Sequence, residues 1–276
     1  MPVRRAYADV AHGQMHYAEC VAADAALGAR AGRDDATPFV LLHQTPRSWR
    51  EYAEVLPLLG ARRRAIAIDT AGFGESDSVP GAAGIETWAD AALQLLDAIG
   101  IERAHLVGHH TGGVVAVEMT ARAPARVASL TLSSTPYTSE AFRRAREGRP
   151  AIDAVVPSDD GSHLAALWQK RQPFYPRGRP DLLQAFVADA LKVGDVEAGH
   201  RAVASFRMED RIAAARAVPV LIVHASDDPF AAPHLAEWRH LLPAARITTI
   251  AGGVPLPDQC PREFAAALLA FVDALP

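Results

Sequence analysis

The stretch LVGHHTGG, residues 106–113, joins an apolar segment to a helical pattern through two histidines and a threonine. Glycines at positions 108 and 112 flank His109, His110 and Thr111. A glycine on each side permits a sharp turn and close packing of a strand against the helix that follows it. The stretch therefore predicts a strand before the turn, a helix after it, and His110 projecting from its tip.

Short apolar runs recur on both sides of this turn, and helical patterns separate them. Six runs predict strands: FVLLH (39–43), AIAID (65–69), HLVG (105–108), VASLTLS (127–133), VPVLIVHA (218–225) and ARITTI (245–250). Helices are predicted over 48–59, 85–100, 111–123, 233–242 and 261–275. Continuous apolar strands that alternate with helices are typical of a parallel sheet covered on both faces. The predicted fold class is α/β, with a mostly parallel central sheet.

Other segments depart from this rhythm. RRAYADV (4–10) and QMHYAEC (14–20) flank His12-Gly13, which predicts an antiparallel hairpin. Residues 22–38 are rich in Ala, Gly and Asp, which predicts a surface loop. Between about 138 and 209 there is no strand pattern, and prolines divide four helical patterns. We therefore predict a core at 1–137, a helical insertion at 138–209 and the rest of the core at 210–276.

Five segments resemble motifs of the α/β-hydrolase fold superfamily, in the order of that family. They are LLHQTPRSWREY (41–52), AIAIDTAGFGESD (65–77), VGHHTGG (107–113), VPVLIVHASDDPF (218–230) and AGGVPLPDQCPREFAAALLAFV (251–272). In order, they resemble the oxyanion loop, the D-x-x-G-x-G-x-S-D segment, the G-x-S-x-G nucleophile elbow, the acid-bearing strand and the terminal segment. The insertion resembles the caps of epoxide hydrolases, haloalkane dehalogenases and C–C hydrolases. The resemblance implies an α/β-hydrolase fold with a helical cap.

The catalytic positions of that family are altered in three places. His110 stands where the elbow nucleophile belongs, and Gln44 replaces the oxyanion-loop glycine. Val254 stands where the terminal segment would carry the general-base histidine. The position of the catalytic acid is kept by Asp228, with Asp227 beside it as a substitute. A Ser-His-Asp triad cannot be assembled from these residues.

An imidazole at the elbow suits proton transfer near neutral pH. We predict that the ring of His110 reaches the acid directly and forms a contracted His110–Asp228 dyad. Such a dyad would activate water or remove a proton from a substrate. Gln44 and Thr111 are the predicted oxyanion donors. His43 resembles the family's loop-organising histidine and is also a candidate for substrate contact, as is Trp168 of the cap.

These residues favour an enzyme that acts on a small apolar carbonyl compound, such as an ester, lactone or diketone, by His-Asp general-base catalysis. Two alternatives stay open. The same base would also suit a cofactor-free lyase or isomerase. A catalytically inactive, ligand-binding protein on the same fold is the second alternative, because a fold alone does not define a function.

Composition and motif spacing indicate which partners, location and cofactors to expect. The 276 residues carry a net charge of −4, with no basic run longer than residues 62–64, which argues against nucleic acid and membrane partners. No apolar run approaches a membrane span, and the N-terminus lacks a signal-peptide core, so we expect a cytoplasmic protein. Neither short metal-ligand spacing nor a phosphate loop occurs, so we expect no metal and no cofactor. A zinc site of His43, His110 and Asp228 is a lesser alternative, and a homodimer stays open.

Overall fold

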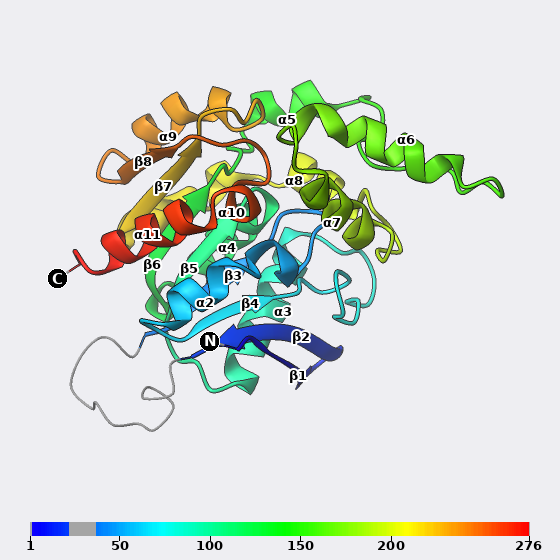
Figure 1. The fold of residues 1–276 in the computed structure, drawn as a ribbon. Coiled ribbons are helices and arrows are strands. Elements are labelled where there is room, and N and C mark those ends of the chain that lie inside the picture. Colours follow the sequence, from blue (N-terminus) through cyan, green and yellow to red (C-terminus); the bar gives the residue numbers. More distant parts are fainter. Residues whose placement is uncertain (1, 22–36, 276) are drawn as a thin grey trace.

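The computed structural model describes residues 2–21 and 37–275. The protein has one eight-stranded sheet at its centre. The strand order is β1-β2-β4-β3-β5-β6-β7-β8 (Figure 1). Most of residues 22–38, the predicted surface loop, lie outside the described residues. No helix in the described part of the chain is long and apolar enough to span a membrane.

The N-terminal hairpin is confirmed. Strands β1 (Arg4–Val10) and β2 (Gly13–Cys20) pair antiparallel, with Val10 opposite Gly13 at the turn. Strand β2 also pairs antiparallel with β4, which joins the hairpin to the rest of the sheet.

The six other strands run parallel to one another, as their apolar runs predict. They are β3 (Phe39–Leu42), β4 (Ala65–Ile68), β5 (Ala104–His109), β6 (Val127–Ser133), β7 (Val220–Ala225) and β8 (Arg246–Ile250). Neighbouring pairs from β4 to β8 are all parallel. Strands β3, β4 and β5 are fully buried, as expected for strands covered on both faces. Their carboxyl ends meet at one edge, where ligand sites of such sheets form.

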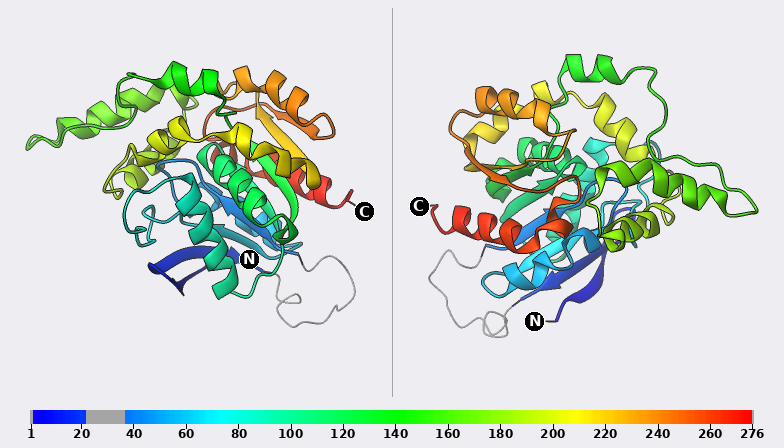
Figure 2. Two further views of the ribbon diagram at one scale, coloured as in Figure 1. Left: turned by 180° about the vertical axis from the view of Figure 1, so that it is seen from behind. Right: turned by 45° about the horizontal axis from the view of Figure 1, so that its top comes forward.

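Helices cover both faces of the sheet (Figures 1 and 2). Helices α3 (Ile85–Ala98) and α4 (Thr111–Arg122) contribute to one hydrophobic cluster, with Leu95 and Val114 among its members. Helices α2 (Val55–Gly60) and α11 (Pro261–Val272) contribute to a second, with Leu59 and Phe264. Two of the predicted helices are divided. Residues 48–59 form the 3-10 turn η2 (Trp49–Tyr52) and then α2, and residues 233–242 form η7 (Ala232–His234) and then α9 (Leu235–Leu241).

All the regular secondary structure between about 138 and 210 is helical. It contains α5 (Glu140–Arg146), α6 (Ser162–Arg171), η4 (Gln172–Phe174), α7 (Pro180–Ala190), α8 (Ala198–Ser205) and η5 (Met208–Asp210). Helices α6 and α7 share a small hydrophobic cluster of their own. The remaining short helices are η3 (Pro124–Arg126), η6 (Ile212–Ala217) and α10 (Leu256–Gln259). The insertion lies beyond the carboxyl edge of the strands in Figure 1, and several of its residues line the pocket described next.

Candidate active site

The turn between β5 and α4 holds His110 in a strained backbone conformation. Its φ is 45° and its ψ is −113°, values that non-glycine residues rarely adopt. The flanking glycines make this turn possible. A Cβ atom on Gly108 would overlap the backbone of Gly112, and a Cβ atom on Gly112 would overlap the carbonyl oxygen of Leu42. Strand β3, the turn and α4 are therefore packed so closely that the side chain of His110 is directed into the pocket.

The His110 ring reaches a carboxylate at the end of β7. Its Nε2 lies 2.7 Å from Oδ2 of Asp228, and the His110 side chain is 13% exposed, whereas that of Asp228 is fully buried. Because a carboxylate accepts, Nε2 carries the hydrogen of this bond and Nδ1 keeps the lone pair. Nδ1 makes no hydrogen bond to any residue that the structure describes. The pair has the geometry of an oriented general base.

Asp228 is held as a charged acceptor. Its second oxygen, Oδ1, accepts hydrogen bonds from the backbone N–H groups of Phe230 (2.9 Å) and Ala231 (3.2 Å). Burial opposes its charge, but His110 and these donors outweigh burial and lower the pKa of Asp228 to about 2. Its neighbour Asp227 is exposed and accepts a hydrogen bond from Ser226 instead. Of the two candidate acids, Asp228 is the one that lies against His110.

His109, the other histidine of the turn, is part of the support. Its Nε2–H donates to the carbonyl oxygen of Val254 (2.8 Å), and its Nδ1 accepts from the hydroxyl of Ser133 (2.9 Å). Burial lowers its pKa to about 3, so it stays neutral at neutral pH. The ring of His109 packs edge-on against that of His110, with centroids 4.6 Å apart. Val254 thus lines the pocket and binds His109, whose ring in turn packs against that of His110.

The two predicted oxyanion donors, Gln44 and Thr111, differ in whether their N–H groups are already bonded. The backbone N–H of Gln44 donates to the buried carboxylate of Glu51 (2.9 Å), and its side-chain Nε2 donates to the same group (2.5 Å). Gln44 lines the pocket, but only its second amide hydrogen is left for a ligand. Thr111 also lines the pocket, and its backbone N–H at the start of α4 has no partner among the described residues.

Thr45 is a donor that the sequence analysis missed. It lines the pocket, and neither its N–H nor its buried hydroxyl has a partner in the described part of the chain. Its position beside Gln44 in the LLHQTP segment is the signal that was available. The N–H groups of Thr45 and Thr111 belong to loops that follow neighbouring strands, which is the arrangement of an oxyanion hole.

Two predicted contacts with substrate need correction. His43 is buried with both ring nitrogens occupied: Nδ1–H donates to the Gln44 carbonyl (2.8 Å) and Nε2 accepts from the Thr70 N–H (3.0 Å). It organises the oxyanion loop and has no free atom for a substrate. Trp168 packs beside the α6–α7 cluster and is absent from the pocket lining, because α6 directs it toward the cap's own core.

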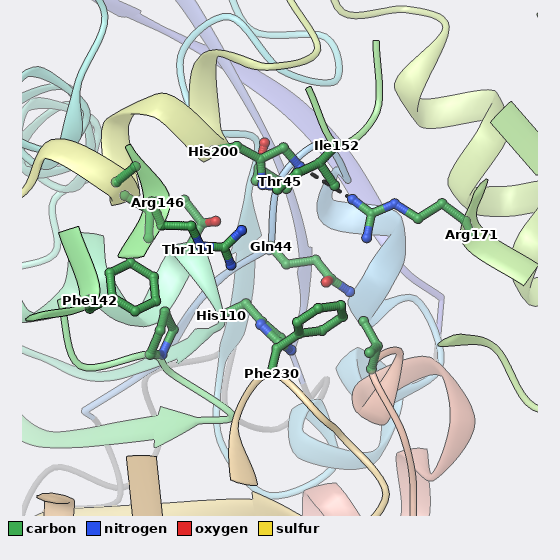
Figure 3. A pocket seen from close by; sticks show the side chains of 14 residues that line it. Gln44, Thr45, His110, Thr111, Phe142, Arg146, Ile152, Arg171, His200 and Phe230 are labelled. Carbon is green, nitrogen blue, oxygen red and sulfur yellow. Dashed lines mark hydrogen bonds between the residues drawn. The ribbon is translucent and has the colours of Figure 1, made fainter. Parts of the chain in front are cut away.

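The pocket in front of His110 has a volume of about 690 Å³, its open mouth included (Figure 3). Apolar side chains from the cap and core form much of its wall, among them Phe142, Val203 and Phe230. Arg146, Arg171 and His200 of the cap also line it, and none of these was singled out from the sequence. Their sequence signal is weak, because arginines in amphipathic helices are ordinarily solvent-exposed.

The described residues contain no cluster of three or more His, Cys, Asp or Glu side chains placed to bind a metal. The zinc alternative also lacks one of its ligands, since both nitrogens of His43 are already bonded. The site thus contains a base, an acid that orients it, and backbone N–H donors.

Comparison with known proteins identifies the family of the fold. Residues 37–253 match the family model described as "alpha/beta hydrolase fold". The chain belongs to the α/β-hydrolase family.

Characterised relatives match over part of their length. The chain is 32% identical to a 2-hydroxymuconate semialdehyde hydrolase of Pseudomonas sp. (strain CF600) over 62% of this chain and 54% of that protein. It is 37% identical to a dihydrolipoyllysine-residue acetyltransferase component of the acetoin cleaving system of Pseudomonas putida, over 40% of this chain and 30% of that protein. The chain thus spans about a third to a half of the length of these relatives.

Solved structures resemble the whole chain. An enol-lactonase from Burkholderia xenovorans LB400 aligns over 97% of this chain and all of that one, with a TM-score of 0.77 and 21% identity. A thermophilic esterase from Thermogutta terrifontis aligns over 98% of each chain, with a TM-score of 0.70 and 19% identity. At such identities these likenesses establish the fold.

Proposed function

We propose that the protein hydrolyses a small, largely apolar carbonyl compound, an ester, a lactone or a diketone, with His110 as general base and Asp228 as its orienting acid. The observation that carries this proposal is the 2.7 Å contact between His110 Nε2 and Asp228 Oδ2, with Nδ1 left unpaired at the pocket. Relatives named as a semialdehyde hydrolase and an enol-lactonase support this class of substrate.

The reaction begins at a water molecule. Nδ1 of His110 takes one proton from the water, and the oxygen attacks the substrate carbonyl carbon. The carbonyl electrons move onto its oxygen and form a tetrahedral oxyanion. The imidazolium stays bonded to the charged Asp228 and then returns the proton to the leaving alkoxide or carbanion as the bond to carbon breaks. No covalent intermediate with the protein is needed.

The oxyanion has a site beside the base. The unpaired N–H groups of Thr45 and Thr111 would donate to it, and the Thr45 hydroxyl or the second Gln44 amide hydrogen would add a third bond. Glu51 supports this loop by accepting from the backbone N–H and from one side-chain amide hydrogen of Gln44. The strain at His110 is consistent with a base that is held in position before the substrate binds.

Isotope labelling tests the proposal. A panel of aryl esters, lactones and β-diketones is incubated with the protein in water enriched in ¹⁸O, and products are examined by mass spectrometry. A hydrolase places one ¹⁸O atom in the carboxylic acid product within a single turnover. Turnover without label would identify a lyase or isomerase, and no turnover of any compound in the panel would favour a binding protein.

The same samples distinguish water attack from attack by the imidazole. An acyl group on His110 would raise the intact mass of the protein during a burst, whereas direct water attack leaves the mass unchanged. Fluorophosphonate probes should label no serine, because no serine stands at the elbow.

A further inference from the structure

The described side chains that line the pocket include basic groups but no carboxylate. Among the lining residues that the structure describes, His110, Arg146, Arg171 and His200 have a basic side chain, and none is Asp or Glu. Three of the four belong to the cap, opposite the elbow. A wall that presents cationic donors and no carboxylate is the environment of an anionic group of a ligand.

Arg171 and His200 are held in place by one buried carboxylate. Asp153 is fully buried and binds Nε and Nη2 of Arg171 as well as Nε2 of His200, the last at 2.7 Å. Although burial opposes its charge, these bonds lower the pKa of Asp153. Asp153 neutralises Arg171 but leaves Nη1 of Arg171 without a partner among the described residues. Because Arg171 lines the pocket, its free Nη1 is available there as an oriented donor, and the bond of His200 to the same carboxylate helps to hold Asp153 in place.

Arg146 has no such counter-charge. It is one of three arginines in α5, and the other two are paired, Arg143 with Glu209 and Arg144 with Glu140. No ion pair of Arg146 occurs within residues 2–21 and 37–275; its guanidinium instead lies 5.3 Å from the ring centroid of Phe142. Burial, and then the charge of Arg149, lower the pKa of Arg146, because no nearby carboxylate among the described residues stabilises its charged form.

The Arg146 side chain reaches into the pocket. Figure 3 draws its guanidinium extending from the wall toward the interior, on the same side as Arg171 and His200 relative to His110. A second hollow shares four residues with the pocket, Arg146 and His200 among them, and is also lined by Arg149, Arg201 and Glu197.

We propose that Arg146, with Nη1 of Arg171, binds a carboxylate carried by the substrate at the end remote from the reacting carbonyl. Of the arginines that line the pocket, Arg146 alone has no counter-charge among the described residues, which suits a monoanionic carboxylate better than a phosphate dianion. The planar guanidinium also matches the two oxygens of a carboxylate. The substrate is thus a keto acid, or an ester or lactone of a dicarboxylic acid, with its carbonyl at His110. This inference rests on the proposed function only for the placement of the carbonyl.

Equilibrium binding tests the subsite without requiring turnover. The probes are a series of acids, phenylacetate to 5-phenylvalerate, each compared by calorimetry with its uncharged amide. At least one acid should bind the wild-type protein roughly tenfold or more tightly than its amide, the size expected of charge-assisted hydrogen bonds. If no acid in the series binds more tightly than its amide, the subsite does not exist.

Variants of α5 test whether Arg146 is responsible for the preference for an acid over its amide. Arg146→Gln should abolish the preference for the acid, Arg146→Lys should retain part of it, and the matched control Arg144→Gln on the same helix should keep all of it. Thermal unfolding of each variant establishes that it is folded. An unchanged preference in folded Arg146→Gln would overturn the assignment.

His110→Ala separates the two proposals. It should bind the acid as the wild type does, because the carboxylate contacts lie on the cap. If this variant keeps full catalytic activity while Arg146→Gln loses the acid preference, the base is misassigned and the subsite stands. If His110→Ala is inactive while Arg146→Gln keeps the acid preference, the base stands and the subsite does not.

Discussion

Nε2 of His110 lies 2.7 Å from Oδ2 of Asp228, although the two residues are 118 positions apart in the chain. The elbow and the acid loop thereby meet without a third residue between them. In a Ser-His-Asp triad the base stands between the nucleophile and the acid. Here the residue at the elbow is itself in contact with the acid, and Val254 closes the place left at the terminal segment.

His110→Ala should reduce kcat/KM on any substrate of the protein by roughly 10²- to 10⁴-fold, the usual contribution of a positioned base. His240→Ala is the matched control, because His240 is exposed on α9 and outside the pocket. Initial rates on the best compound of the ester, lactone and diketone panel provide the measurement. His110→Ser should not produce an efficient esterase, since Val254 cannot activate a serine. Full activity of His110→Ala would exclude the dyad.

The rate should rise with pH along one protonation step and be lost below it, because a protonated imidazole has no lone pair to accept a proton. Asp228 has a pKa of about 2 and stays charged across the assay range. Asp228→Asn removes the charge that favours the protonated ring, so the step should move to lower pH and the plateau should fall. Asp227→Asn, at an exposed neighbour, should leave both unchanged. An unaltered profile for Asp228→Asn would mean that Asp228 is not the partner of His110.

Chelation should leave activity unchanged. The dyad needs no metal for proton transfer, and His43 has no nitrogen free to serve as a ligand. Metal content of the purified protein and rates before and after treatment with a chelator are the measurements. One equivalent of zinc, with activity lost on its removal and regained on its return, would contradict a metal-free base.

Gly112→Ala should destabilise the protein by about 1–3 kcal/mol or more, although alanine is the better helix former. The added Cβ would overlap the carbonyl oxygen of Leu42, so β3 and α4 would have to move apart. Gly194→Ala is the control, because no atom lies within 4 Å of the Cβ it would add. Urea unfolding of both variants measures the difference. Equal stability of the two would show that the close approach of β3 and α4 does not constrain the elbow.

Asp258→Asn should change how stability depends on pH. Asp258 binds Arg47 (2.6 Å) in a buried cluster that also contains Glu51 and Asp189. Burial raises the pKa of Asp258 to about 7, with Arg47 opposing this and the other two carboxylates adding to it. Between about pH 4 and pH 7 the folded state holds a proton that the unfolded state has lost. This group therefore lowers the free energy of unfolding as pH rises, by at most about 1.4 kcal/mol per pH unit.

Urea unfolding at pH 5 and pH 8 checks this sign. The free energy of unfolding of Asp258→Asn minus that of the wild type should become more positive at pH 8. The exposed Asp227→Asn serves as the reference for removing a surface carboxylate. A difference that is constant with pH would show that the buried cluster holds no extra proton.

The periodicity of the sequence was enough to predict the hairpin, the six parallel strands and the run of helices between 138 and 209. These features are local: a strand buried on both faces needs a continuous apolar run, and β6 begins and ends at the predicted residues. The division of residues 48–59 into η2 and α2 could not be predicted. It depends on contacts from outside the segment, such as the hydrogen bond of Trp49 N–H to Asp69 (2.6 Å).

The same distinction holds at the site. Residue type and order are enough to establish that an imidazole occupies the elbow and that no histidine follows in the terminal segment. The folded structure is needed to see that Asp228 rather than Asp227 meets His110, that both nitrogens of His43 are bonded, and that Arg146 has no carboxylate partner among the described residues. Each of these depends on distances of a few ångströms between elements far apart in the chain, and hydrogen bonds and ion pairs are selective over that range.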